Sequence, residues 1–174
     1  MGWQYYTLKN EEQRFHSLDQ IAQNLALNAK AKDKELKDKQ LLEEKKSGKK
    51  DKKLLEQKKS LSESFKMRET VAYGLERFWG EHLRLEEKQP VKSQYWKKTW
   101  DALVGVMQSS GITIPNDTVD VDRPNDVKAM AKKLWSLSRD DQRIALAVLT
   151  QLCDCLVWWT QRYKGATDLD SDDE

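Results

Sequence analysis

The chain has few of the residues that build catalytic, metal-binding or cross-linked sites. Its 174 residues include two histidines and two cysteines, Cys153 and Cys155, with only seven glycines and three prolines. Two cysteines give no disulfide framework, which predicts a reducing, intracellular compartment. The scarcity of glycine and proline, beside long stretches of Glu, Lys, Leu, Gln and Ala, favours helices over strands.

Long apolar runs and catalytic motifs are absent from the sequence as well. No run of about 18 apolar residues indicates a membrane span, and residues 1–10 lack the pattern of a signal peptide. Phosphate-binding glycine loops and the H-E-x-x-H and G-x-S-x-G motifs do not occur. Cys153 and Cys155 are two positions apart, so on a helix they point to nearly opposite sides. We therefore expect a cytoplasmic protein that is not an enzyme and has no cofactor and no metal.

What the sequence has in abundance is charge, and the charge is unevenly distributed. The whole chain carries +2, but Lys30–Lys59 holds thirteen lysines against seven acids, which gives +6. Residues 168–174 carry five acids and no base. This asymmetry points to an acidic partner such as nucleic acid, although a solvated helix and a frayed tail would give the same pattern.

Apolar residues at spacings of three and four predict helices along most of the chain. The first such stripe predicts a helix over Asn10–Lys30, and the thin apolar content after it predicts two charged helical arms meeting at Ser47–Gly48, or a largely disordered linker. The predicted fold class is all-α, a compact bundle of about four helices. The expected divisions are an N-terminal helix at 1–29, a lysine-rich arm or linker at 30–59, the bundle at 60–166 and an acidic disordered tail at 167–174.

Capping signals set the expected boundaries of the first two bundle helices. Ser60 and Glu63 match the S-x-x-E capping box and predict one helix that runs to about Lys88. Ser93 is expected to cap the next helix, which should stop at Gly111.

Similar signals mark the remaining helices. Residues 112–122 are expected to form a loop, and Pro124 to open a helix after it. Ser138, with Asp141, is expected to cap a last helix that ends at Gly165. This helix is apolar over more than half its circumference, so it is either a central helix or a contact surface for a second protein.

Seven tryptophans are many for a chain of this length. Large aromatic rings contribute most in cores and protein interfaces, where we expect most of these residues. The candidate protein-interface residues are Trp96, Trp100, Trp135, Trp158 and Trp159.

Basic residues interleave with the apolar stripes of the predicted bundle, and such side chains neutralise phosphates without reading base sequence. A generic solvated surface explains each of them when it is taken singly. The candidate RNA-binding residues are Arg68, Arg77, Arg84, Lys97, Lys98, Lys128, Lys132, Lys133, Arg139, Arg143, Arg162 and Lys164.

Residues 138–166, SRDDQRIALAVLTQLCDCLVWWTQRYKGA, resemble the small helical subunits of type III CRISPR effector complexes, in both their A-type and B-type versions. Those subunits commonly end in a charged turn, a long apolar helix, and then an aromatic and basic tip. The positions that stand in this pattern are Arg139, Arg143, Trp158, Trp159, Arg162 and Tyr163. Lys30–Lys59 has no counterpart in the pattern.

The resemblance implies a non-catalytic subunit of an antiviral ribonucleoprotein complex. Its copies would associate with one another and with other effector subunits, away from membranes, and hold the backbones of guide RNA and target RNA. Two other hypotheses stay open. One is a helical protein–protein adaptor with a charged coiled-coil arm and no nucleic-acid role, and the other is an unrecognised enzyme or regulator.

Overall fold

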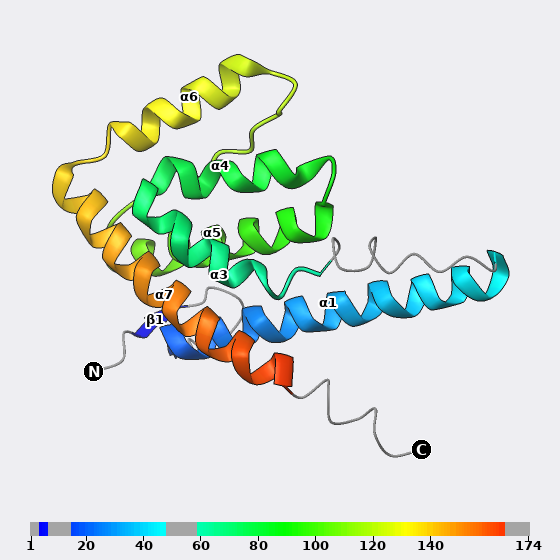
Figure 1. The fold of residues 1–174 in the computed structure, drawn as a ribbon. Helices are drawn as coiled ribbons and strands as arrows, with labels where there is room; N and C mark the ends of the chain where they lie inside the picture. The colour runs from blue at the N-terminus through cyan, green and yellow to red at the C-terminus, as the bar shows by residue number, and fades with distance from the viewer. Residues whose placement is uncertain (1–3, 7–14, 48–58, 166–174) are drawn as a thin grey trace.

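The computed structural model describes residues 4–6, 15–47 and 59–165, and within them the fold is all-α apart from one pair of short strands (Figure 1). The predicted fold class is confirmed. The elements are β1 Gln4–Tyr6, β2 Phe15–Ser17, α1 Leu18–Ser47, α3 Glu63–Thr70, the 3-10 helix η1 Val71–Tyr73, α4 Leu75–Glu86, α5 Pro90–Ser109, α6 Pro124–Trp135 and α7 Arg139–Gly165. Strands β1 and β2 pair antiparallel, with Tyr5 opposite His16.

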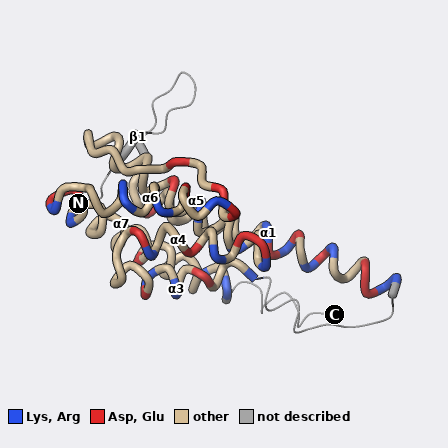
Figure 2. Tube along the Cα trace, turned by 90° about the horizontal axis from the view of Figure 1, so that it is seen from above, with Lys and Arg blue, Asp and Glu red and all other residues tan. Residues whose placement is uncertain are grey.

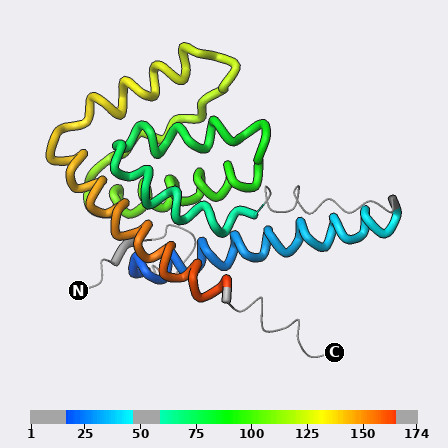
Figure 3. The backbone as a smooth tube through the Cα atoms, in the orientation of Figure 1, coloured from blue at the N-terminus to red at the C-terminus, as the bar shows by residue number. Residues whose placement is uncertain are grey.

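Helix α1 begins later and runs much further than the first apolar stripe predicts. Phe15 lies in β2, so the predicted start near Asn10 is wrong, and the helix instead continues for 30 residues to Ser47. Its first half buries the apolar positions, such as Ile21 and Leu25, in the common core, whereas its second half projects beyond the other helices (Figures 1 and 3). Lysines and acids alternate along this projecting half (Figure 2). The predicted arm is therefore helical up to Ser47, and residues 48–58 lie outside the described part.

The helix predicted from Ser60 to Lys88 is broken in the structure. Gly74 has a φ of 98° and a ψ of 172°, and it separates α3 and η1 from α4. This backbone region is essentially restricted to glycine, so the chain turns here. The break gives the bundle five α-helices after residue 60, one more than the predicted four.

Most of the other boundaries follow the expected signals. Helix α5 begins at Pro90 rather than at a Ser93 cap, because proline fits the first helical turn, where its missing N–H is not needed. Gly111 has a φ of 80° just after the end of α5, and Pro124 opens α6. Residues 112–120 form no helix or strand, as predicted. The Ser138 hydroxyl accepts a bond of 3.0 Å from the Asp141 N–H, which confirms the cap of α7.

The core lies where α5 and α7 pack against the neighbouring helices. Trp79, Trp96 and Trp100 are each at most 1% exposed, and the rings of Phe78 and Trp96 lie 4.9 Å apart. Trp96 and Trp100 are therefore core residues, and their prediction as protein-interface residues is wrong. Sequence spacing places both rings on an apolar stripe but does not tell a core from an interface.

Helix α7 is the central helix that its apolar circumference predicts. It buries Ala145, Leu149, Leu152 and Leu156 completely, and it packs against α1, α3 and α5. By length and composition alone α7 would also qualify as a membrane span. Core helices of water-soluble proteins pass the same test, so this property is weak evidence for a membrane location.

Candidate nucleic-acid interface

Five exposed side chains lie on the last turns of α6 and the first turns of α7, and we call this set of residues the α6–α7 corner. It consists of Lys128, Lys132 and Trp135 on α6, and Arg139 and Arg143 on α7. Helix α6 buries its apolar stripe in the core, which turns its remaining positions outward. Spacings of four and three place the three α6 residues on one helix face, and a spacing of four does the same for the two arginines.

In the part of the chain that the structure describes, no acid is paired with any of the four cations of the α6–α7 corner. Within residues 4–6, 15–47 and 59–165, none of them forms an ion pair or a side-chain hydrogen bond. The neighbouring Asp140, which is exposed, and Asp141, which is partly exposed, lie in the first turn of α7, where the helix dipole favours negative charge. The corner thus presents cationic side chains whose hydrogen-bonding capacity is free for an external anion.

Four other predicted RNA-binding cations form surface ion pairs with acids of the same chain. An acid beside a cation offsets part of its charge, so such a pair attracts a phosphate less strongly than an unpaired cation does. The ion pairs are Arg68–Asp154, Arg84–Glu81, Lys97–Asp101 and Lys133–Asp117. Arg77 on α4 lies over the ring of Tyr73 at 6.0 Å, and Lys98 on α5 is exposed. The twelve predicted cations are therefore spread over five helices, and only those of the α6–α7 corner form an unpaired group.

The C-terminal end of α7 forms a second aromatic and basic surface, which we call the α7 tip. The Arg162 guanidinium lies 4.1 Å from the centre of the Trp158 ring and 5.2 Å from that of Trp159. Tyr163 stacks on Trp159 at 5.7 Å, and the Trp159 indole N–H donates to Asp19 of α1 at 2.9 Å. Trp159 thus fixes α7 to α1, whereas Trp158 remains 52% exposed. Lys164, the last predicted cation, lies over Phe65 at 5.2 Å.

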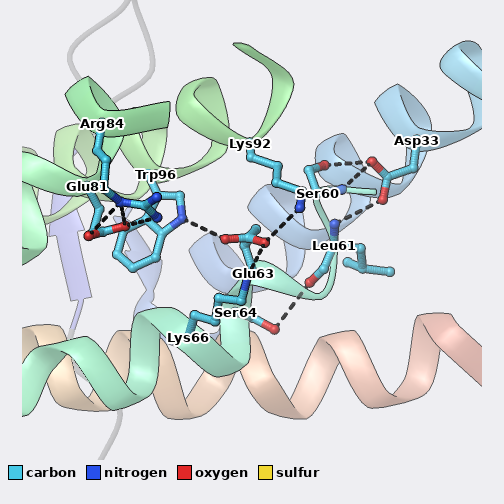
Figure 4. Close-up of polar contacts among 10 residues, drawn as sticks. All are labelled: Asp33, Ser60, Leu61, Glu63, Ser64, Lys66, Glu81, Arg84, Lys92 and Trp96. Carbon is cyan, nitrogen blue, oxygen red and sulfur yellow. Dashed lines mark hydrogen bonds and ion pairs between the residues drawn. The ribbon is translucent and has the colours of Figure 1, made fainter. Parts of the chain in front are cut away.

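A polar cluster lies at the base of the projecting half of α1 (Figure 4). The sequence analysis does not predict it. The Asp33 carboxylate accepts hydrogen bonds from the Ser60 N–H at 2.6 Å, the Ser60 hydroxyl at 2.8 Å and the Leu61 N–H at 2.9 Å. Ser60 therefore does not cap α3, and the predicted capping box with Glu63 is wrong. Asp33 therefore links α1 to the residues that lead into α3.

Glu63 lies deeper in the same cluster and is only 2% exposed. Its carboxylate accepts the Trp96 indole N–H at 3.2 Å, and it is paired with Lys66 at 3.1 Å and Lys92 at 3.3 Å (Figure 4). Burial raises the pKa of this carboxyl, but the hydrogen bonds from Trp96 and Lys66 and the charges of both lysines outweigh it, so the pKa lies below the usual value of a glutamate. The cluster is a structural anchor between α3 and α5.

The Cys153 thiol and the His82 imidazole are buried in the core, and the Cys155 thiol is partly buried. Burial raises the pKa of Cys153 and of Cys155, which suppresses thiolate formation at neutral pH. Burial also lowers the pKa of His82, whose ring nitrogen Nδ1 contacts the Trp79 carbonyl oxygen. No group of three or more His, Cys, Asp or Glu that could hold a metal ion occurs among the residues the structure describes.

Comparison of the chain with known protein families, curated proteins and solved structures found no match. The function is therefore inferred from the chemistry of the α6–α7 corner and the α7 tip.

Proposed function

We propose that this chain is a non-catalytic, RNA-binding subunit of a CRISPR-type RNA-guided effector complex. In this role the α6–α7 corner holds the sugar–phosphate backbone of guide RNA and target RNA. The observation that carries the proposal is the group of four exposed cations at the corner, Lys128, Lys132, Arg139 and Arg143, without acid partners in the described chain. The resemblance of residues 138–166 to small effector subunits selects this class among RNA-binding proteins.

The charges of the corner suit backbone binding rather than base reading. Lysine ammonium groups on flexible side chains and arginine guanidinium groups neutralise phosphates and release the counterions around them. In an A-form duplex the bases are hidden in a deep, narrow groove, so a protein recognises shape and phosphate position. A surface of this kind therefore holds RNA of any sequence, as a subunit of a guide-programmed complex must.

Exposed aromatic side chains at the α7 tip support contacts with other subunits. Trp158 is half exposed and carries Arg162 on its face, and tryptophan and arginine are the residues most enriched in the energetic centres of protein interfaces. The same surface suits the alternative hypothesis of a helical adaptor without a nucleic-acid role.

Charge reversal tests the corner directly. The double variant Arg139→Glu/Arg143→Glu should bind labelled RNA at least about tenfold more weakly, and the slope of log affinity against log salt should fall by about two, one unit for each lost phosphate contact. Fluorescence anisotropy at several salt concentrations measures both quantities. The matched control is Arg77→Glu/Arg84→Glu on α4, where Arg84 is already paired to Glu81.

Two outcomes would contradict the proposal. Unchanged RNA affinity of the corner variant would remove the corner as the binding surface, and an equal loss in the α4 control would indicate diffuse attraction.

Purification of the tagged chain from its native cell tests the assembly: short RNAs of uniform length with several larger proteins support the effector subunit. Protein partners without RNA would instead establish the adaptor.

A further inference from the structure

Trp135 is the part of the α6–α7 corner that phosphate binding leaves unexplained. It is the last residue of α6 and is 66% exposed, more than any other described tryptophan. Within the described part of the chain its ring contacts no aromatic ring or cation, and its indole N–H has no hydrogen-bond partner. Neutralising phosphates requires no aromatic ring, and leaving so large an apolar surface in water forgoes the stabilisation that burial gives.

We propose that Trp135 stacks on an unpaired base of a single-stranded nucleic-acid segment whose phosphates contact Lys128 and Lys132. This inference rests on the proposed function and narrows its ligand from RNA backbone in general to a strand with accessible bases.

The spacing of the three residues fits such a strand. Lys132 and Lys128 precede Trp135 by three and seven positions, so they lie about 4.5 and about 10 Å away along the helix axis on the same face. A single strand that follows this face places phosphates near the lysines and turns a base onto the indole ring. Aromatic platforms beside a cationic track are the combination by which proteins bind single strands without sequence preference.

A duplex does not use this ring in the same way. Its bases are already stacked on one another, so an indole on the protein surface meets only sugars and phosphates along the duplex. A protein partner is also disfavoured, because the neighbours of Trp135 along its face are lysines, which are depleted from the cores of protein interfaces. The residues around the ring thus favour single-stranded nucleic acid.

The test compares strands with and without bases. The full chain and its variant Trp135→Ala bind two labelled probes of equal length, an oligouridylate and an abasic strand with the same phosphates. Wild type should prefer the oligouridylate, and Trp135→Ala should lose about five- to one-hundred-fold of that affinity while binding the abasic strand as wild type does. Trp135→Phe, which keeps an aromatic ring, should retain most of the affinity, and the salt slope should stay unchanged in both variants.

Trp158→Ala is the matched control, because Trp158 is also half exposed but lies at the other end of α7. Equal oligouridylate affinity of wild type and Trp135→Ala overturns the stacking. An equal loss of affinity for both probes also overturns the stacking, because the loss of a base contact cannot weaken the binding of an abasic strand. If the stacking is overturned but Lys128→Glu/Lys132→Glu weakens the binding of both probes, the proposed function stands without the stacking. If neither variant changes binding, the proposed function fails as well.

Discussion

At the scale of single residues, Glu63 stands out as a buried carboxylate held by three partners, Trp96, Lys66 and Lys92. A carboxylate that is 2% exposed is costly unless donors surround it, and here the donors come from α3 and α5. Lys92, its partner on α5, is itself only 9% exposed. Removal of the carboxylate therefore leaves a buried ammonium group without an anion.

The variant Glu63→Gln should lower the free energy of unfolding by about 3 kcal/mol at pH 7. Urea unfolding followed by circular dichroism measures this difference. Glu69→Gln on the same helix is the matched control, because Glu69 is exposed and its loss should change stability by less than about 0.5 kcal/mol. Equal stability of the Glu63 variant and wild type would show that the buried pair contributes nothing.

The pH dependence of the same variant follows from the lowered pKa of Glu63. Because the pKa of Glu63 is lowered in the folded protein, the stability that the carboxylate provides is present above the ordinary glutamate pKa of about 4.3. It is lost as the pH falls through the folded-state pKa. The stability difference between wild type and Glu63→Gln should therefore be constant from pH 7 to pH 5 and shrink below pH 4.5, in unfolding curves at each pH.

At the scale of elements, Gly74 decides that two helices form where the sequence pattern suggests one. An alanine Cβ at this position would meet no atom within 4 Å, so its φ of 98°, not crowding, opposes any other residue. Gly105 inside α5 also has open space around it, but without the unusual φ. The two glycines thus separate the effect of backbone conformation from that of packing.

Opposite changes in stability are expected when each glycine becomes alanine. Gly74→Ala should destabilise the fold by about 1–3 kcal/mol, because alanine is strained in this backbone region. Gly105→Ala should stabilise it by about 0.5–1 kcal/mol, because alanine favours the helix. Thermal unfolding of the two variants beside wild type checks the signs, and a stabilising Gly74→Ala would mean that α3 and α4 join into one helix at no cost.

Local signals predict several helix boundaries, but at Ser60 a contact with a distant residue overrides the local signal. Gly111, Pro124 and Ser138 act on their own neighbours in the chain, so their positions alone give the end of α5 and the starts of α6 and α7. Ser60 carries an equally good local signal, but the carboxylate of Asp33, 27 residues away, accepts its hydroxyl. No single-sequence pattern indicates that competition.

At the scale of the whole molecule, α7 packs against α1, α3, α4 and α5, and Cys153 reports on its integrity. Cys153 is fully buried and its thiol pKa is raised by burial, so it should react with alkylating reagents only when α7 leaves the core. Its rate of modification should rise with urea in parallel with global unfolding. Peptide mass spectrometry after timed alkylation measures the rate, and fast modification in water would contradict a packed α7.

The candidate site was only partly predictable at this scale. The sequence indicates which residues are basic, and all four cations of the α6–α7 corner are among the predicted ones. It does not indicate which cations meet an acid in three dimensions, as Arg68 meets Asp154 across 86 positions of chain. It also does not separate the buried Trp96 from the exposed Trp135, because both lie among lysines and apolar residues in the sequence.

Because α7 is one continuous helix, it sets the distance between the two surfaces at its ends. Arg139 and Arg162 are 23 residues apart on one helix, which sets a distance of about 35 Å between the α6–α7 corner and the α7 tip. Because a helix is stiff, a ligand at one end and a partner at the other are held at a fixed separation and a fixed rotation. A change of a few residues in the length of α7 would alter both together, so the proposed function depends on the length of this helix.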